Sequence, residues 1–210
     1  MADHPGPSAT ASAPASIGNV GVGFDILGLA FDAARDRVTA VLEAAAGVRL
    51  GAVSGLMTSL PGAPATNTAL AAAQALLEAA GAEFGVRLSI DKGVPLSAGM
   101  GGSAASAVAA AAAVNALLPK PFATADLLHF ALAGERVSCD PPPWDNVVAA
   151  LFGGLVLVAG GRSGHAVSPP SEALRRWPRQ RDSHPVRLLA IAEQLLRAAG
   201  SLLEALQDLA

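Results

Sequence analysis

The stretch from Val94 to Leu118 constrains the fold more than any other, because a glycine-rich loop runs directly into an alanine-rich tract. Gly99, Gly101 and Gly102 permit the positive φ angles and the close backbone approach that a tight loop needs. Alanine has the highest helix propensity, so we expect a long helix to begin near Ser103. The free N–H groups at the positive end of such a helix suit an anion. The sequence therefore predicts a phosphate-binding loop.

Other interpretations of this stretch compete with a phosphate-binding loop. The uncharged segment 93–118 is long enough to cross a bilayer, but its proline and glycines disfavour a continuous helix. The pattern Gly99-Met-Gly101-Gly-Ser-Ala104 satisfies a dinucleotide-binding fingerprint, but no second strand with an acidic end follows the helix. A P-loop is excluded, because no lysine follows the last glycine. A glycine-rich turn that only lets a helix pack closely remains open.

Composition favours a globular protein and argues against several kinds of partner. Of the 210 residues, 52% are hydrophobic and 15% are charged, so most of the chain is not expected to be disordered. The net charge is -3 and only 4% of the residues are aromatic, so nucleic acid is not expected as a partner. The single cysteine, Cys139, excludes an internal disulfide framework, and we interpret it as a small apolar filler. The start of the chain lacks signal-peptide features, so we expect a cytoplasmic protein without a membrane partner.

Hydrophobic periodicity predicts an α+β fold after a disordered lead over residues 1–12. We expect strands at residues 26–31, 36–45, 48–53, 86–91 and 155–159, and helices at residues 67–80, 103–118, 124–137, 146–151 and 185–209. The strands at 36–45 and 48–53 are expected to form a hairpin.

Three motifs resemble those of a known family. Pro95-Leu-Ser-Ala-Gly-Met-Gly-Gly-Ser-Ala-Ala105 resembles the nucleotide loop of the GHMP small-molecule kinases, P-x-x-x-G-L-G-S-S-A-A, with Met100 and Gly102 as departures. The stretch from Ala13 to Gly28 is similar to the opening motif of the homoserine kinases in that superfamily. The stretch from Pro143 to Gly154 resembles a third motif, H-x-D-N-V-A-P-A-L-x-G-G, in which Asp145 and Asn146 match and Pro143 and Val148 depart. The resemblance is strong over residues 13–158 and weak beyond them, where about the last third of a usual member is missing.

The resemblance implies a fold and an activity. The fold is the GHMP kinase fold, with an N-terminal α/β domain like domain 2 of ribosomal protein S5 over residues 13–159. An incomplete ferredoxin-like C-terminal domain would follow over residues 160–210. The activity is ATP-dependent phosphorylation of the L-homoserine hydroxyl, a step of threonine biosynthesis, with Mg²⁺ and without a dedicated catalytic base. The alternatives are a kinase for another small alcohol, or an inactive relative that only binds nucleotide or a partner. For the shortened chain we expect marginal stability, self-association through the C-terminal helix as a homodimer, or a damaged second domain.

The resemblance also implies roles for particular residues. Ser103 and Glu135 would hold Mg²⁺ and, with Asn146, make up the catalytic set. Asn19, Asp25, Asn146 and Arg175 (or its neighbour Arg176) would contact the substrate, with Asp25 bonding its ammonium group. The nucleotide-binding residues implied are Asn67, Pro95, Leu96, Ser97, Ala98, Gly99, Met100, Gly101, Gly102, Ser103, Ala104 and Ala105.

Most of these side chains also have a purely structural interpretation. Asn67 is a good N-cap for the helix that follows it, and Asp145 could cap the helix at 146–151. Asn19 and Asp25 are typical turn formers. Glutamate on a helix is most often solvated, and the arginines near 175 could form a basic linker.

Overall fold

The computed structural model describes residues 6–20, 26–159 and 166–168, which all belong to one compact unit over residues 1–171. Its elements are β1 (Ser8–Ile17), β2 (Leu27–Glu43), β3 (Gly47–Gly55), the 3-10 turn Pro64–Thr66, α1 (Thr68–Ala79), β4 (Gly85–Lys92), α2 (Gly102–Asn115), the 3-10 turn Thr124–Asp126, α3 (Leu127–Glu135), α4 (Trp144–Phe152), β5 (Leu155–Ala159) and β6 (Ala166–Ser168). The helix expected at 185–209 lies outside the described residues. The α+β fold is confirmed.

The sheet is built around β2, which pairs antiparallel with β1, β4 and β5. The order of the sheet path is β3-β4-β2-β5-β6, and β3 runs parallel to β4. Residues 26–31 and 36–45, expected as two strands, are joined in one strand, because a register shift opposite Pro14 lets residues 32–34 bulge out. The expected hairpin is also wrong, since β4 lies between β2 and β3.

The N-terminal lead is shorter than expected. Residues 8–12 belong to β1 and pair with residues 37–41 of β2, so a disordered lead over residues 1–12 is wrong for that part. Exposed serine and threonine side chains alternate there with half-buried alanines, which is strand patterning in weakly hydrophobic residues. At the other end, β6 pairs with β5 and extends the sheet past residue 159. The boundary proposed at residue 159 stays a prediction.

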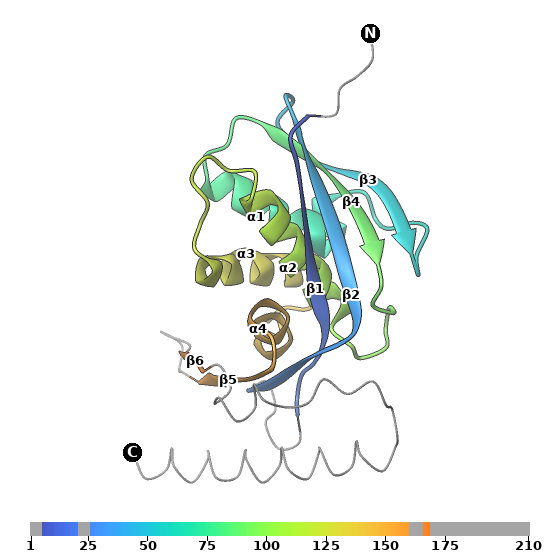
Figure 1. Cartoon of the computed structure of the whole chain (residues 1–210), viewed down its shortest axis with the longest axis vertical. Coiled ribbons are helices and arrows are strands. Elements are labelled where there is room, and N and C mark those ends of the chain that lie inside the picture. The colour runs from blue at the N-terminus through green and yellow to red at the C-terminus, as the bar shows by residue number, and fades with distance from the viewer. Residues whose placement is uncertain (1–5, 21–25, 160–165, 169–210) are drawn as a thin grey trace. The chain divides into compact units, whose positions relative to one another are not determined.

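Helices α1 to α4 lie on one side of the strands (Figure 1). Nearly every position of α2 is buried, and its small alanine side chains allow α1 and α3 to pack closely against it. Gly134 of α3 also lets α3 approach α1, because a Cβ there would overlap the carbonyl oxygen of Thr68 in α1. This packing brings the ends of α2 and α3 together. The chain from 102 to 115 is too short for the membrane span considered above, and no helix among the described residues is long and apolar enough for one.

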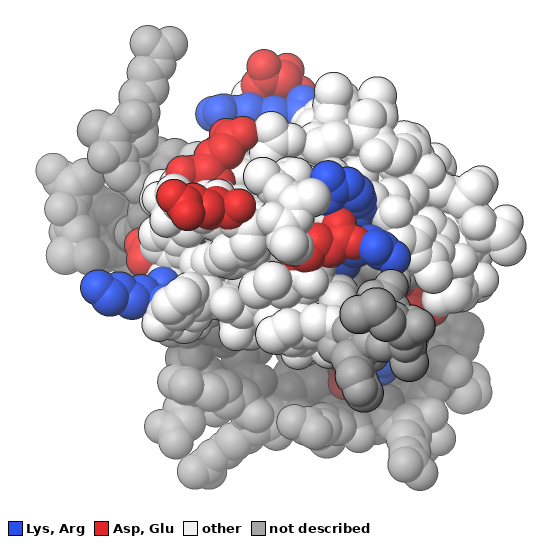
Figure 2. Space-filling model, turned by 90° about the horizontal axis from the view of Figure 1, so that it is seen from above, with Lys and Arg blue, Asp and Glu red and all other residues white. Residues whose placement is uncertain are grey.

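The other face of the sheet is polar. Arg49 pairs with Glu43 at 2.9 Å, Arg87 donates to Glu43 at 2.6 Å, and Arg37 pairs with Asp91 at 3.5 Å. Figure 2 shows acidic and basic side chains side by side in small groups on the face that it presents. Such pairs add little to stability.

Candidate functional site

The predicted phosphate loop leads directly into the N-terminus of α2. Gly101 is the N-cap, in the left-handed region with a φ of 62°, and no side chain caps the helix. The first N–H groups of an uncapped helix have no partner within it. Residues 95–99 are exposed, and Ser97 and Gly99 also have positive φ angles. The loop therefore presents unpaired backbone donors at the positive end of a helix dipole.

The loop touches both of the other sequence motifs. The N–H of Ser16 donates to the carbonyl oxygen of Met100 at 3.0 Å, and its hydroxyl donates to Asn146 Oδ1 at 3.2 Å. Gly101 is pressed against both side chains: a Cβ there would overlap Ser16 Oγ and lie 3.0 Å from Asn146 Oδ1. The three motifs thus meet at one place, with Ser16, which sequence reasoning did not single out, between them.

Asp145 joins the third motif to the first. Its carboxylate is fully buried and accepts the N–H of Asn19 at 2.6 Å and the N–H of Asn146 at 2.9 Å. Helix α4 begins at Trp144, so Asp145 lies in its first turn and is not the N-cap expected from the sequence. Asn19 has a φ of 55°, which fits its interpretation as a turn former. Asp25 and Arg175 lie outside the described residues.

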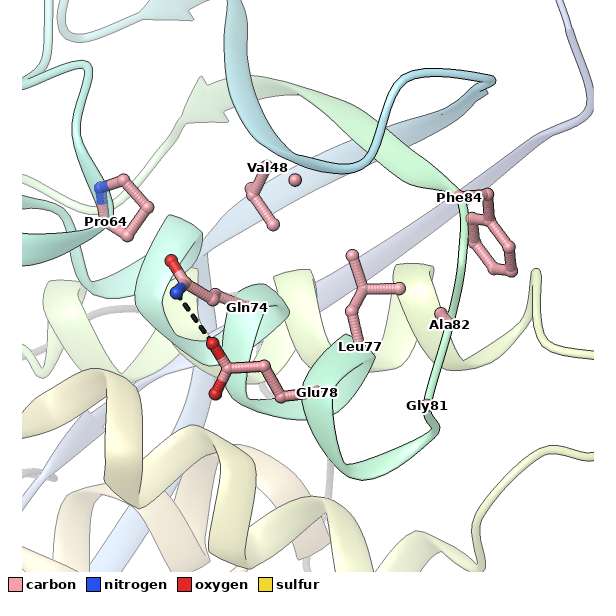
Figure 3. A pocket seen from close by; sticks show the side chains of 9 residues that line it. Val48, Pro64, Gln74, Leu77, Glu78, Gly81, Ala82 and Phe84 are labelled. Atoms are coloured by element: carbon pink, nitrogen blue, oxygen red, sulfur yellow. Dashed lines mark hydrogen bonds between the residues drawn. The ribbon is translucent and has the colours of Figure 1, made fainter.

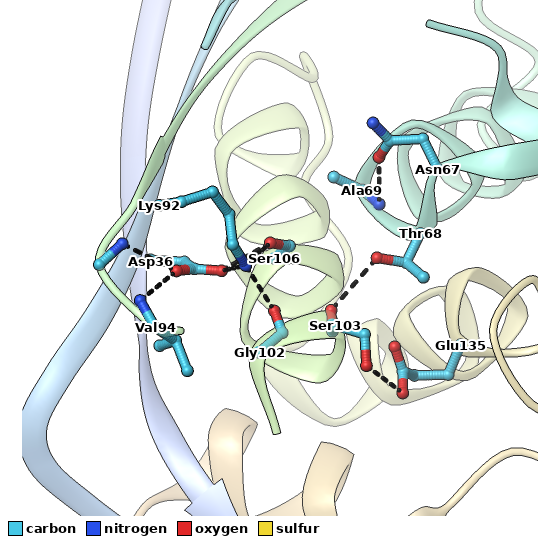
Figure 4. Close-up of polar contacts among 11 residues, drawn as sticks. Asp36, Asn67, Thr68, Ala69, Lys92, Val94, Gly102, Ser103, Ser106 and Glu135 are labelled. Carbon is cyan, nitrogen blue, oxygen red and sulfur yellow. Dashed lines mark hydrogen bonds and ion pairs between the residues drawn. The ribbon is translucent and has the colours of Figure 1, made fainter. Parts of the chain in front are cut away.

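Glu135 faces the first turn of α2. Ser103 Oγ donates to Glu135 Oε2 at 3.0 Å (Figure 4). The side chain is not solvated surface: Glu135 is 1% exposed, and its Oε1 is buried without a hydrogen-bond partner. Burial raises the pKa of this carboxyl from 4.5 to about 7, against the smaller lowering effects of the Ser103 hydrogen bond and the Lys92 charge. A cation at Oε1 would stabilise the charged form of this buried carboxyl.

The comparisons with known proteins agree with these motifs. Residues 67–154 match the model of the GHMP kinases N terminal domain. Over these residues the chain is similar to that domain. A homoserine kinase of Xanthomonas campestris pv. campestris (strain B100) is 48% identical over 149 residues, which are 71% of this chain and 46% of that protein. The chain thus spans about half the length of the curated relatives it matches.

Solved structures give the same result for the fold. The crystal structure of a homoserine kinase from Cytophaga hutchinsonii matches with a TM-score of 0.71 and 37% identity, over 80% of this chain and 52% of that one. A mevalonate kinase from Methanococcus jannaschii matches with a TM-score of 0.58 and 15% identity, over 72% of this chain and 53% of that one, which shows a shared fold. The GHMP kinase fold expected from the sequence is confirmed over the described residues.

The site has a donor set that fits Mg²⁺. No group of three or more His, Cys, Asp or Glu side chains converges within the described ranges. Magnesium does not need one, since it is usually held by one or two protein oxygens together with phosphates and water. Ser103 Oγ and the unpartnered Glu135 Oε1 supply hard oxygen ligands beside the loop. The residues present therefore fit the ion.

Asn67 has a structural role at the start of α1. Its Oδ1 accepts the N–H groups of Ala69 and Leu70 at 3.0 and 3.3 Å, and its Nδ2 donates to the Pro61 carbonyl at 2.8 Å. The N-cap interpretation is confirmed. Contact between Asn67 and the nucleotide stays a prediction. These hydrogen bonds already use much of the donor and acceptor capacity of the Asn67 amide.

A buried polar cluster beside the site was missed by sequence reasoning. Asp36, Lys92 and Ser106 are buried together directly beneath the loop (Figure 4). The signal was present in the strand alternation. Side chains alternate between the two faces of a strand, so Lys92 points to the same buried face as Leu88 and Ile90. This alternation predicts a charged side chain in the core.

Two other features of the described structure lie apart from the site. A hollow of about 410 Å³ between α1 and the starts of β3 and β4 is lined in part by Leu77, Gln74 and Glu78 (Figure 3). Its Gln74 and Glu78 side chains bond each other at 2.8 Å, and none of its lining residues belongs to the motifs. Cys139 is exposed, so its interpretation as an apolar filler is wrong.

Proposed function

We propose that this chain supplies the nucleotide-binding and acceptor-binding part of an ATP-dependent homoserine kinase, which phosphorylates the side-chain hydroxyl of L-homoserine. The observation that carries the proposal is the contact between motifs: the uncapped α2 N-terminus touches Ser16 and Asn146 on one side and Glu135 on the other. A phosphate held by the loop would therefore lie beside both a metal-binding pair and the substrate motifs. Relatives named homoserine kinases, up to 48% identical, support the substrate.

Each part of the site has a distinct task in this proposal. The backbone N–H groups at the start of α2 bind the triphosphate. Ser103 and Glu135 hold Mg²⁺, which would neutralise phosphate charge as the phosphoryl group moves. Asn146, held by Ser16, orients the acceptor hydroxyl. Asn19 and Asp25 bind the amino-acid part of the substrate, and Arg175 binds its carboxylate.

The proposed reaction has no dedicated base. Asp145 is the nearest buried carboxylate to Asn146, and both of its oxygens accept backbone N–H groups. We assign it to positioning Asn19 and Asn146. Phosphoryl transfer needs little covalent chemistry from the protein, so correct placement of hydroxyl and phosphate carries most of the rate. A cytoplasmic location and a homodimer stay predictions.

The activity is tested by ADP release from ATP with homoserine, threonine or mevalonate as acceptor. We expect kcat/KM for homoserine to exceed that for mevalonate by about 100-fold, since a site built to bind an ammonium group rejects an acceptor that leaves it unpaired. Threonine keeps the ammonium and carboxylate groups, but its hydroxyl is secondary and one carbon nearer to them, so we expect it to be the poorer acceptor because the hydroxyl is misplaced. Higher kcat/KM with another alcohol would identify the chain as part of a GHMP kinase for that alcohol. Retained ATP binding without turnover of any acceptor would favour the inactive relative.

A further inference from the structure

Asp36 of β2 and Lys92 of β4 form an ion pair in the core, with 0% and 2% of their side chains exposed. Both residues lie on the inner face of the sheet, where their neighbours at alternate positions are apolar. Burying two charges is expensive, and apolar side chains of similar size often stabilise a fold as well or better. A pair of this kind therefore calls for an explanation other than stability.

The hydrogen bonds of this pair run to both ends of the phosphate loop. Asp36 Oδ1 accepts the N–H groups of Gly93 and Val94, at 3.1 and 2.9 Å, where the chain enters the loop. Lys92 Nζ donates at 2.9 Å to the carbonyl oxygen of Gly102, where the chain leaves it. Asp36 thus fixes the entry and Lys92 the exit (Figure 4).

Ser106, one turn further along α2, connects the two charges. Its hydroxyl donates to Asp36 Oδ2 at 2.6 Å and accepts from Lys92 Nζ at 2.9 Å. All three ammonium donors of Lys92 are then used, by Asp36, Ser106 and the Gly102 carbonyl. The cluster is complete within itself, so it holds backbone and has no free group for a ligand.

The loop needs such anchoring because it contains Ser97, Gly99 and Gly101 at positive φ within five residues. Glycine in particular gives up much conformational freedom when it is fixed in one conformation. The outer residues of the loop, 95–99, are exposed and gain little stability from packing. The position of the α2 N–H groups therefore depends on the two ends of the loop.

We propose that Asp36, Lys92 and Ser106 are positioning residues that lock both ends of the loop, so that the first N–H groups of α2 are held ready for a triphosphate. They act through the backbone of Gly93, Val94 and Gly102 and touch no ligand. The identity of the anion rests on the proposed function, whereas the anchoring of the loop does not.

The double variant Asp36→Asn with Lys92→Met isolates the tie at the exit of the loop. It removes both charges together, and the asparagine Oδ1 can still accept from Gly93 and Val94. We expect the melting temperature to stay near that of the wild type. Amide hydrogen exchange over residues 93–105 should become at least 10-fold faster, and exchange in α3 should not change. The dissociation constant for ATP should rise at least 10-fold, and that for homoserine should stay within 2-fold.

A matched control is available on the same two strands. Arg37→Met with Asp91→Asn removes an ion pair of the outer sheet face, one position from the buried pair on each strand, and should leave all these values unchanged. If the buried double variant does not fold, Ser106→Ala decides: we expect exchange over residues 93–105 about 3-fold faster.

The outcomes separate the two proposals. Wild-type exchange over residues 93–105 in the folded double variant, or in Ser106→Ala if that variant is unfolded, overturns the positioning role. An equal rise in the dissociation constants for ATP and for homoserine also overturns the positioning role, since the substitutions would then disturb the whole site. If the wild type binds no ATP, the proposed function fails, and the exchange rates of the ligand-free protein alone judge the anchoring.

Discussion

Replacing Glu135 by glutamine is expected to lower kcat for Mg²⁺-dependent phosphorylation by a factor on the order of 10³. The amide has nearly the same size as the carboxyl but cannot balance the charge of a metal ion. Glu135 Oε1 is buried without a partner beside the first turn of α2, so the charge removed is directed at the proposed metal site. Steady-state kinetics across a Mg²⁺ titration measure the effect, and the Mg²⁺ concentration for half-maximal rate should rise.

Ser103→Ala should lower turnover in the same direction, because it removes the second proposed ligand. Both variants should keep the fold: near-ultraviolet circular dichroism and the melting temperature at pH 5 should match the wild type. Activity within 3-fold of the wild type for Glu135→Gln at saturating ATP would show that this carboxylate does not hold the metal.

The second large effect is on stability as a function of pH in the absence of Mg²⁺. The pKa of Glu135 is about 7 in the folded protein, against 4.5 when unperturbed. The folded state therefore binds more protons than the unfolded state between these values, and the free energy of unfolding falls as pH rises. This contribution is complete below pH 4.5 and is lost above pH 7. At 1.36 kcal/mol per pKa unit, the loss is about 3 kcal/mol.

Denaturant titrations in EDTA at a series of pH values measure this loss. Glu135→Gln cannot ionise, so it should equal the wild type near pH 4.5 and exceed its free energy of unfolding by about 3 kcal/mol at pH 8. Glu83→Gln, at an exposed glutamate, controls for the substitution itself and should follow the wild-type curve. Parallel curves for the wild type and Glu135→Gln would mean that the carboxyl is solvated in the folded protein.

The sequence predicts best where one local signal decides the structure. Alanine propensity and the glycines fixed α2 and its loop, and Asn67 was recognised as an N-cap, since these depend on a few neighbouring residues. The candidate site rests on motifs that are local too, and the contacts of Ser16 with Met100 and Asn146 show that the three motifs meet in space, whereas the roles of their residues stay predictions.

Pairing between distant segments was harder to predict. The hairpin at residues 36–53 failed because β4, more than thirty residues further along, takes the place beside β2. The sequence predicts a disordered lead where β1 begins, because the serines, alanines and threonines there are weakly hydrophobic; pairing with the long strand β2 makes this segment ordered.

The burial of charged residues likewise depends on tertiary structure. Glu135 and Asp145 are polar residues on helices, and nothing local shows that α2 covers one and that the turn at Asn19 covers the other. The alternation of side chains along β2 and β4 places Asp36 and Lys92 on the buried face of each strand. That the two charges meet becomes clear only once β2 and β4 are known to be neighbours.

The central claim is that the backbone around residues 99–103 holds a triphosphate between the metal pair and the substrate motifs. A crystal structure with a non-hydrolysable ATP analogue and Mg²⁺ tests it most directly. We predict phosphate oxygens on the first N–H groups of α2 and a metal ion bound by Ser103 and Glu135, with Asn146 facing the terminal phosphate. A triphosphate bound anywhere else on the chain would contradict the account.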